Sequence, residues 1–420
     1  MMKHFISIAA LVSTFCFATA TLAVGSPRLT VSGKVIDSVG QPLGNATVMV
    51  YHAGVKIGYS TFCPSCYEDC GKRTRTDAAG FYTFTKLNSD LWFELLIVRD
   101  RYAPAFVKVA DSTNGMAPTA VLTLRTPITD PATVVKGRVI DAAGNAVPDA
   151  VVNSVGVEVD KGSLFGTIAG LDPLAVTNDN GEFELVYAKP AKRMLLSVEA
   201  RTLAPKFAAL DIGPERQTIE LARGATIRGR LMQDGKPVGN AEIGLIGQRR
   251  GGFGPQLTII GTPYSELRVG TQEDGSFTLS NVPVQTNWYI YAKMDSVASR
   301  GATEPKACAT TRPEETVNVG EIQLRPGYHL EGKVLLSDGK SVPEGMRVII
   351  TSERVPDNQT AILDKSGHFD FPGLPQGIYS ISPAVTGYSL PDGQSEVEIS
   401  VERNLNDFVI SLNPTTPPAR

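Results

Sequence analysis

Four segments of this chain repeat one pattern, and that repetition limits the possible folds more than any other feature of the sequence. Each segment contains a Gly followed by Lys or Arg, a short apolar run, a turn with Gly, and a second apolar run. The copies read VSGKVIDSVGQPLGNATVMV from Val31, VKGRVIDAAGNAVPDAVV from Val135, IRGRLMQDGKPVGNAEIGL from Ile227 and LEGKVLLSDGKSVPEGMRVII from Leu330. Their anchoring glycines, about 100 residues apart, are Gly33, Gly137, Gly229 and Gly332. The sequence therefore predicts one small unit that is present four times.

A second block follows each opening and predicts further strands. It reads TDAAGFYTFTKL from Thr76, TNDNGEFELVY from Thr177, TQEDGSFTLSNVP from Thr271 and LDKSGHFDFPGLP from Leu363. Gly in these turns is typical of hairpins, because Gly reaches positive φ without steric cost. Residues after each turn alternate with the period of a half-buried strand, in the pairs Phe81/Thr83, Phe183/Leu185, Phe277/Leu279 and Phe369/Phe371. Short strands closed by turns, without a sustained helical period, indicate an all-β chain of β-sandwiches.

The expected organisation is a signal peptide followed by four tandem β-sandwich domains. The predicted boundaries are 1–23 for the signal, then 28–126, 132–223, 224–325 and 327–414 for the sandwiches. At the N-terminus, Lys3 precedes an apolar run, and small residues at Ala20 and Ala23 would suit cleavage. The apolar run is shorter than the roughly 20 residues that span a bilayer. We therefore expect an exported protein, periplasmic, cell-surface or secreted, without a transmembrane span.

The two blocks together resemble the carboxypeptidase regulatory-like domain. The shared pattern is GxVxDxxGxPxxxAxVxV followed by TxxGxFxxxxLPxGxYxL, and it covers all four units. The segments RDRYAPAF from Arg99 and EARTLAPKF from Glu199 resemble a strand end common in such repeats, although its Gly is missing from both. The resemblance implies transthyretin-like (Ig-like, prealbumin-type) sandwiches, which occur in tandem on exported bacterial proteins. Such sandwiches are grouped with starch-binding-like folds, which implies carbohydrate binding by fold analogy alone.

Catalytic motifs are missing from the sequence. None of the four histidines begins the His-x-x-Glu or His-Glu-x-x-His motif of a zinc peptidase, and Gly-x-Ser-x-Gly is absent. The SDGKS segment from Ser337 lacks the first Gly of a phosphate loop. The Asp-Gly turns lack the spaced oxygen ligands that calcium needs. With a net charge of −3 and interspersed acids and bases, nucleic acid is not favoured as a partner. We expect a non-enzymatic protein without a cofactor.

Three cysteines, Cys63, Cys66 and Cys70, lie close together on one predicted inter-strand loop. The preferred interpretation is a disulfide between two of them, because an exported location favours oxidation. A second possibility is a zinc site that adds His52 to the three thiolates. A third is redox chemistry at the Cys-x-x-Cys formed by the first two, but this chemistry needs a helix N-terminus that the sequence does not predict. Cys308 is expected to be a free or partly buried thiol.

Four aromatic residues are candidates for stacking against a sugar ring: Trp92, Trp288, Tyr289 and Tyr291. They lie on strands of which one face must fill a core, so burial is the competing interpretation. The expected function is non-catalytic binding or scaffolding at the cell envelope, with polysaccharide as the first candidate ligand. The alternative is a structural or adhesive surface protein that acts through contacts with envelope or surface proteins, without a small-molecule ligand. Short connections such as LARGATI and LRPGYHL predict touching neighbours in a semi-rigid rod.

Overall fold

The computed structural model describes residues 28–60, 67, 69–109, 115–126, 130–247 and 266–415, and its regular structure is almost entirely strand. Within these ranges, eight sheets form four pairs that follow one another along the chain. Each pair encloses its own cluster of buried apolar side chains, which is the layered arrangement of a β-sandwich. The expected all-β sandwich class is confirmed. The domain boundaries and the signal peptide stay predictions, and residues 1–23 lie outside the described ranges.

The first sandwich contains β1 (Arg28–Asp37), β2 (Thr47–Val55), β3 (Arg73–Arg75), β4 (Phe81–Asn88), β5 (Leu91–Val98), β6 (Ala105–Val109) and β7 (Ala120–Leu122). The second contains the 3-10 helix η1 (Pro131–Thr133), β8 (Val134–Asp141), β9 (Val151–Val159), β10 (Gly162–Phe165), β11 (Leu174–Val176), β12 (Glu182–Val186), β13 (Arg193–Glu199), β14 (Lys206–Asp211) and β15 (Arg216–Leu221).

The third sandwich contains β16 (Ala225–Gln233), β17 (Lys236–Pro237), β18 (Glu242–Gly247), β19 (Leu267–Gly270), β20 (Ser276–Val282), β21 (Thr286–Ala292), the short helix α1 (Met294–Val297), β22 (Lys306–Thr310) and β23 (Thr316–Gln323). The fourth contains β24 (Tyr328–Leu336), β25 (Arg347–Ser352), β26 (Asn358–Ile362), β27 (His368–Leu374), β28 (Gly377–Ala384), β29 (Tyr388–Ser389), the 3-10 helix η2 (Pro391–Gly393), β30 (Val397–Val401) and β31 (Leu405–Pro414).

One topology recurs in all four sandwiches. In one sheet the first strand pairs antiparallel with the strand that follows the second-block turn and parallel with the last strand of the unit, as β1 does with β4 and β7. The corresponding sets are β12-β8-β15, β20-β16-β23 and β27-β24-β31. The opposite sheet has the order β3-β2-β5-β6, repeated as β11-β9-β13-β14, β19-β18-β21-β22 and β26-β25-β28-β30. The repeated sequence thus corresponds to a repeated strand order.

The repeated Gly of each unit lies opposite an aromatic ring on the neighbouring strand. Gly137 on β8 pairs with Phe183 on β12, and a Cβ atom added at Gly137 would lie 2.1 Å from the Phe183 ring. Gly at this position lets the ring lie flat across the bare backbone of its cross-strand neighbour. The other pairs are Gly33–Tyr82, Gly229–Phe277 and Gly332–Phe369.

In the first unit the residues that point into the core lie one position later in the chain than expected. Strand β4 buries Tyr82 and Phe84, whereas Phe81 and Thr83 are exposed. The predicted alternation is correct there, but its phase is wrong, and a shift of one residue exchanges the two faces of a strand. In the other units the expected aromatic residues are buried: Phe183, Phe277, Phe369 and Phe371.

The turns of the second repeated block are closed by their own polar side chains, but the prediction that they are hairpins is wrong. Each turn leads from a strand of one sheet to a strand of the opposite sheet, as from β3 to β4, because the two strands pair with different neighbours. Asp77 Oδ1 accepts two backbone N–H groups of its turn, both at 2.9 Å. Asn178 and Asp364 hold the equivalent turns in the same way. Gly80 in the first of these turns has a φ of 79°, which favours Gly. The Asp or Asn residues of these blocks therefore act as Asx-turn acceptors.

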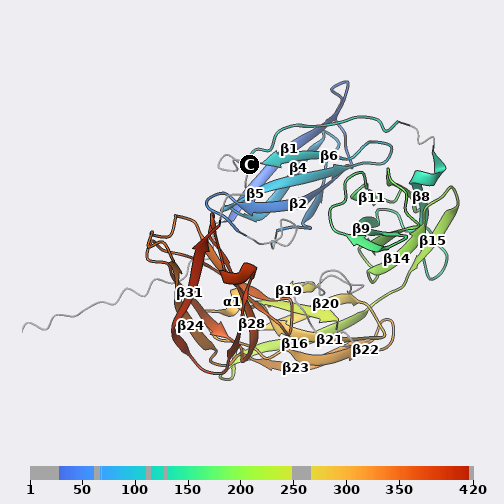
Figure 1. Cartoon of the computed structure of the whole chain (residues 1–420). Helices are drawn as coiled ribbons and strands as arrows, with labels where there is room; N and C mark the ends of the chain where they lie inside the picture. Colours follow the sequence, from blue (N-terminus) through green and yellow to red (C-terminus); the bar gives the residue numbers. More distant parts are fainter. Residues whose placement is uncertain are drawn as a thin grey trace, which may run out of the picture.

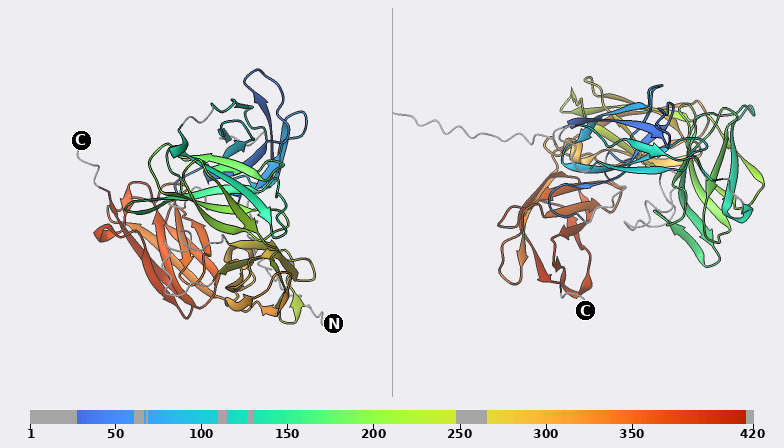
Figure 2. Two further views of the ribbon diagram at one scale, coloured as in Figure 1. Left: turned by 90° about the vertical axis from the view of Figure 1, so that its right-hand side faces the viewer. Right: turned by 90° about the horizontal axis from the view of Figure 1, so that it is seen from above.

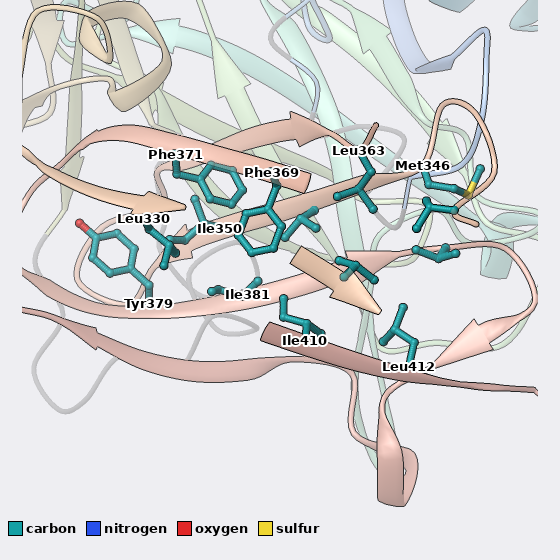
Figure 3. Packing of buried hydrophobic residues seen from close by; sticks show 14 of the residues in the cluster. Leu330, Met346, Ile350, Leu363, Phe369, Phe371, Tyr379, Ile381, Ile410 and Leu412 are labelled. Atoms are coloured by element: carbon teal, nitrogen blue, oxygen red, sulfur yellow. The ribbon is translucent and has the colours of Figure 1, made fainter. Parts of the chain in front are cut away.

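The core of the fourth sandwich illustrates the packing between the two sheets (Figure 3). Phe369 and Phe371 lie on β27 in one sheet, with their ring centroids 5.6 Å apart. Ile350 and Ile381 contribute from β25 and β28 in the opposite sheet. Met294 from α1 also belongs to this cluster, so the third sandwich supplies part of the fourth sandwich's core.

The four sandwiches are arranged around a closed loop, and the predicted rod is wrong (Figures 1 and 2). Figure 1 shows the first sandwich at the top, the second on the right, the third at the bottom and the fourth on the left. Neighbours touch as expected, but the first and fourth sandwiches also meet, because Arg347 Nη1 donates to the carbonyl oxygen of Ile57 at 3.0 Å. The short connections keep consecutive sandwiches in contact. Contacts between residues far apart in the sequence, such as Arg347 with Ile57, bring the first and fourth sandwiches together.

Candidate functional site

A cleft of about 800 Å³ lies where the first three sandwiches meet, and we call it the three-unit cleft. Its volume is within the range of roughly 300–1,000 Å³ that is common for ligand sites. The lining comprises Thr47, Arg73, Thr74 and Arg75 from the first sandwich, Asp149, Val151, Ser197, Glu199, Ala200, Arg201, Leu203 and Pro205 from the second, and Glu266, Leu267, Arg268, Ser280 and Asn281 from the third.

Ion pairs between sandwiches hold the walls of this cleft in place. Arg73 Nη2 lies 2.9 Å from Glu199 Oε2, and Arg75 Nη1 lies 2.9 Å from Asp149 Oδ1. Both pairs are partly exposed, so each stabilises the junction only modestly, by about 1 kcal/mol or less. Deeper in the same junction, the first and second sandwiches bury an apolar contact. It comprises Met49, Leu96, Val98, Val151 and Leu174, with Tyr51 and Val176 at its margin.

On the third sandwich's side, the cleft ends at a buried ionic cluster that joins the third and fourth sandwiches. Lys293 Nζ lies 2.9 Å from Asp357 Oδ1 and 3.1 Å from Glu266 Oε1. Asp357 Oδ2 also accepts the N–H of Met294 at 2.8 Å. Glu266 further accepts hydrogen bonds from the Tyr291 hydroxyl and from Arg268 Nε. The polar atoms of this junction are therefore bonded to one another across the two sandwiches.

The environment of this cluster shifts the pKa values of its members. Complete burial raises the pKa of Asp357, because the charged carboxylate loses its hydration. Burial opposes the charge on Lys293, but the carboxylates of Asp357 and Glu266 outweigh that effect and raise its pKa. Burial, reinforced by Glu266, raises the pKa of Tyr291 well above its usual value, so the phenol keeps its proton. Removing one partner would leave an uncompensated charge in the junction.

The contact between the first and fourth sandwiches depends on one buried Arg. Arg347 Nη1 donates to the carbonyl oxygens of Ile57 at 3.0 Å and Tyr59 at 3.4 Å. Burial lowers the pKa of this guanidinium, although it stays charged because the starting value is so high. The backbones of Gly58 and Gly345 lie against each other here, where a Cβ on Gly58 would be 2.0 Å from the Gly345 carbonyl oxygen.

A carboxylate, an imidazole and a hydroxyl also meet between the first two sandwiches. His52 Nδ1 lies 2.8 Å from Glu94 Oε2, and His52 Nε2 lies 3.5 Å from Thr167 Oγ1. This order of groups resembles a hydrolytic triad. However, His52 and Glu94 are direct cross-strand partners on β2 and β5, which is an ordinary sheet ion pair. Thr167 is exposed, at the limit of hydrogen-bond distance and also bonded to Tyr51.

The candidate zinc and disulfide residues are only partly described. Cys63 and Cys66 lie outside the described ranges. Cys70 packs against the core of the first sandwich. His52 directs its two ring nitrogens toward Glu94 and Thr167, so zinc would have to displace one of these neighbours. No cluster of three metal-binding side chains occurs in the described part of the chain, and both the disulfide and the zinc site stay predictions.

The cysteine of the third sandwich is partly buried, as expected. Cys308 lies on β22 opposite Trp288 and packs against the core of that sandwich. Burial raises the pKa of its thiol to about 11. At neutral pH the thiol is therefore protonated and a poor nucleophile.

The structure divides the four candidate stacking aromatics into buried and accessible ones. Trp288 is fully buried and donates from Nε1 to Thr310 Oγ1 at 2.9 Å, so its ring fills the third sandwich's core. Tyr291 is 1% exposed and belongs to the junction with the fourth sandwich. Neither ring can present a face to a sugar in this structure. Trp92 and Tyr289 are half-buried, with Lys108 Nζ lying 4.6 Å from the Trp92 ring.

Sequence reasoning missed the three-unit cleft and the ionic junctions. Arg73 and Arg268 lie within the short strands β3 and β19, and nothing in their neighbours along the chain distinguishes them from other arginines. One weak signal was available: Lys293 directly follows the apolar run NWYIYA, where a charged residue enters a largely buried strand end. The partners come from other units, so only tertiary contacts bring them together.

No family model matches the chain, so its resemblance to carboxypeptidase regulatory-like domains stays a prediction. No curated protein matches it either.

Similar solved structures include the TIE protein of Bacillus anthracis, with 12% identity over 94% of this chain and 76% of that chain, and a TM-score of 0.19. The full-length RrgB pilus protein of Streptococcus pneumoniae is 10% identical over 94% of this chain and 99% of that chain, with a TM-score of 0.18. A minor pilin of Streptococcus agalactiae is 15% identical over 47% of this chain and 99% of that chain, with a TM-score of 0.26. Such low TM-scores mean that the overall arrangements differ, so none of these likenesses carries a function to this chain.

Helices in the described ranges are short, and none has the length and hydrophobicity of a membrane span.

Proposed function

We propose that this chain is a non-catalytic, exported structural or adhesive protein that acts through contacts with envelope or surface proteins. The observation that carries the proposal is the closed arrangement of sandwiches, held together at its junctions by charged and polar side chains. Lys293 with Asp357 joins the third and fourth sandwiches, and Arg347 joins the fourth to the first. Such a body keeps one shape and presents several sheet edges and loops to a partner.

The polar residues at the junctions support a structural role. Glu266 and Asp357 bind Lys293, while Glu199 and Asp149 bind arginines of the neighbouring unit. Enzyme sites need carboxylates and bases that face a substrate with pKa values suited to proton transfer. Here these groups serve the junctions between sandwiches.

The test is binding of the purified, labelled protein to isolated cell-envelope fragments of the producing cell. We expect binding that survives periodate oxidation of the sugars and is lost after protease treatment of the fragments. Loss on periodate alone would indicate a polysaccharide ligand and contradict the proposal. Absence of binding to untreated fragments would contradict it as well.

Polysaccharide binding is the second candidate, and one observation favours it. Trp92 is half-buried on the outer face of β5, and its ring already takes part in a contact with the Lys108 ammonium. The ring also lies against the Gly54 backbone, so a sugar would stack on it by displacing the Lys108 ammonium, since a surface that attracts a cation also suits polarised C–H groups. Under this reading, a Trp92→Ala variant would lose retention on a polysaccharide column while Tyr289→Ala, at the partly buried junction, would keep it.

A further inference from the structure

We propose that the three-unit cleft binds an extended acidic segment of a partner protein, which adds as a strand to the open sheet edges in its walls. This inference rests on the proposed function and specifies the surface and the chemistry of the partner. Two features support it, namely the strand edges that border the cleft and the balance of charges inside it.

Two edge strands border the cleft from opposite sides. Strand β3 hydrogen-bonds only to β2, and β19 hydrogen-bonds only to β18, so each leaves one edge without a neighbouring strand within the described ranges. The cleft lining includes all three residues of β3 and the first two residues of β19. An open edge offers backbone donors and acceptors to an added strand. The cleft therefore brings two such edges to one binding region.

The cleft carries an excess of positive charge although the chain as a whole has a net charge of −3. Its lining has four guanidinium groups against three carboxylates. The three carboxylates are already paired with Arg73, Arg75 and Arg268, so the excess positive charge of the lining lies on Arg201. The Arg201 guanidinium is exposed, and in the described part of the chain no ion pair engages it. The Arg201 guanidinium can therefore pair with a carboxylate of the ligand.

Apolar side chains complete the recognition surface. Val151, Leu203 and Leu267 lie in the lining beside the charged groups. Side chains alternate between the two faces of an added strand, so one face of the ligand would meet arginines while the other meets apolar walls. This pattern fits a segment that alternates acidic and apolar residues, and it fits a uniformly charged polymer less well.

The test uses the full mature chain and fluorescein-labelled ten-residue peptides. One peptide alternates Glu and Val, the second alternates Lys and Val, and the third is the Glu–Val peptide with N-methyl groups on alternate amides. We expect fluorescence anisotropy to show binding of the first peptide alone, since the second reverses the charge and the third removes backbone donors. Equal binding of the first and third peptides would contradict strand addition, and equal binding of the first two would contradict acidic recognition.

Arg201→Gln tests the site, with Arg403→Gln as a matched control. Arg403 is an exposed arginine on a turn of the fourth sandwich, outside the cleft. Loss of one charge-assisted hydrogen bond predicts about tenfold weaker peptide binding for Arg201→Gln and no change for the control. Equal affinity of the two variants would place the peptide elsewhere and overturn the proposal. Binding of an oligogalacturonate but not of the Glu–Val peptide would also overturn it in favour of an acidic sugar polymer.

The same variants separate this inference from the proposed function. If Arg201→Gln and the wild type bind untreated envelope fragments equally, and the Glu–Val peptide does not bind, the cleft proposal is wrong while the adhesive role stands. If neither protein binds the fragments, the adhesive role itself fails, whatever the result with the peptides.

Discussion

At the scale of single residues, the four units provide comparisons with one another inside one chain. Tyr82 occupies the position that Phe183, Phe277 and Phe369 occupy in the other units. Its hydroxyl is buried and has no hydrogen-bond partner among the described residues. Burial raises the pKa of this phenol to about 12. The other three units have Phe at this position, so the first unit alone buries a hydroxyl group there.

Tyr82→Phe should leave the stability of the protein unchanged or raise it by about 1 kcal/mol. The substitution removes a buried hydroxyl that lacks a partner while keeping the ring over Gly33. Urea denaturation followed by tryptophan fluorescence would measure the change. A loss of more than about 1 kcal/mol would show that the hydroxyl makes a stabilising contact.

Asp274 allows a test of local pH dependence. Hydrogen bonds from Ser276 and Arg230 lower its pKa from 3.8 to about 2. Because the folded-state pKa lies below the unfolded one, the stabilising contribution is present above about pH 4 and is lost as the pH falls through about 2. NMR titration of the Asp274 carboxyl carbon should show the lowered midpoint. A midpoint near 3.8 in the folded protein would contradict the hydrogen bonds.

At the scale of elements, the antiparallel pair of a unit's first strand with the strand after the second-block turn explains the repeated sequence. The Gly of the first strand accommodates an aromatic ring of its partner, and the Asx turn leads the chain from the opposite sheet into this pair. Thr76 adds a bridge, because its hydroxyl accepts the N–H of Ala46 at 2.8 Å and donates to the Leu43 carbonyl at 2.6 Å. Thr177 and Thr271 repeat this bridge, while the fourth unit replaces it with the buried Leu363.

Gly137→Ala should destabilise the second sandwich by about 1–3 kcal/mol. The new Cβ atom would overlap the Phe183 ring, and moving the ring would strain a packed core. Gly213→Ala is the control, because a Cβ at Gly213 would meet open space. Thermal unfolding would measure both, and equal midpoints for the two variants would contradict the packing explanation.

At the scale of the whole molecule, charged and polar contacts between sandwiches decide the arrangement. The third and fourth sandwiches share Lys293, Asp357 and Glu266, all largely buried. The first and fourth meet at Arg347. The second and third touch where Asn281 Nδ2 donates to the Arg201 carbonyl oxygen at 3.1 Å. These residues are far apart in sequence, so each contact constrains the path of the chain.

Asp357→Ala should weaken the junction of the third and fourth sandwiches by about 3–5 kcal/mol, because it leaves the buried Lys293 without its nearest counter-ion. The double variant Lys293→Met with Asp357→Leu should recover most of that loss, since it removes both charges. Chemical denaturation of the wild type, Lys293→Met, Asp357→Leu and the double variant would give the coupling energy. Additive losses in the double variant would mean that the two residues do not act as a pair.

Arg347→Ala should open the contact between the first and fourth sandwiches. Small-angle X-ray scattering would then show a larger radius of gyration than the wild type. Arg354→Ala is the matched control, because its pair with Glu304 at 3.2 Å is exposed and the junction has the buried cluster as well. An unchanged radius for Arg347→Ala would mean that other contacts close the loop.

The sequence by itself determined the all-β class, the positions of the second-block turns and the repeated unit, because these depend on alternation and turn chemistry within stretches of about 20 residues. It did not show that each of these turns leads from one sheet to the other, because a turn sequence alone does not decide which strands will pair. It did not decide whether Trp288 and Tyr291 are buried or presented to a ligand, since two faces of a strand look alike until each is covered. The three-unit cleft, the ionic junctions and the closed loop were decided only by tertiary structure. They depend on residues such as Arg347 and Ile57, which lie 290 positions apart and meet only when the whole chain has folded.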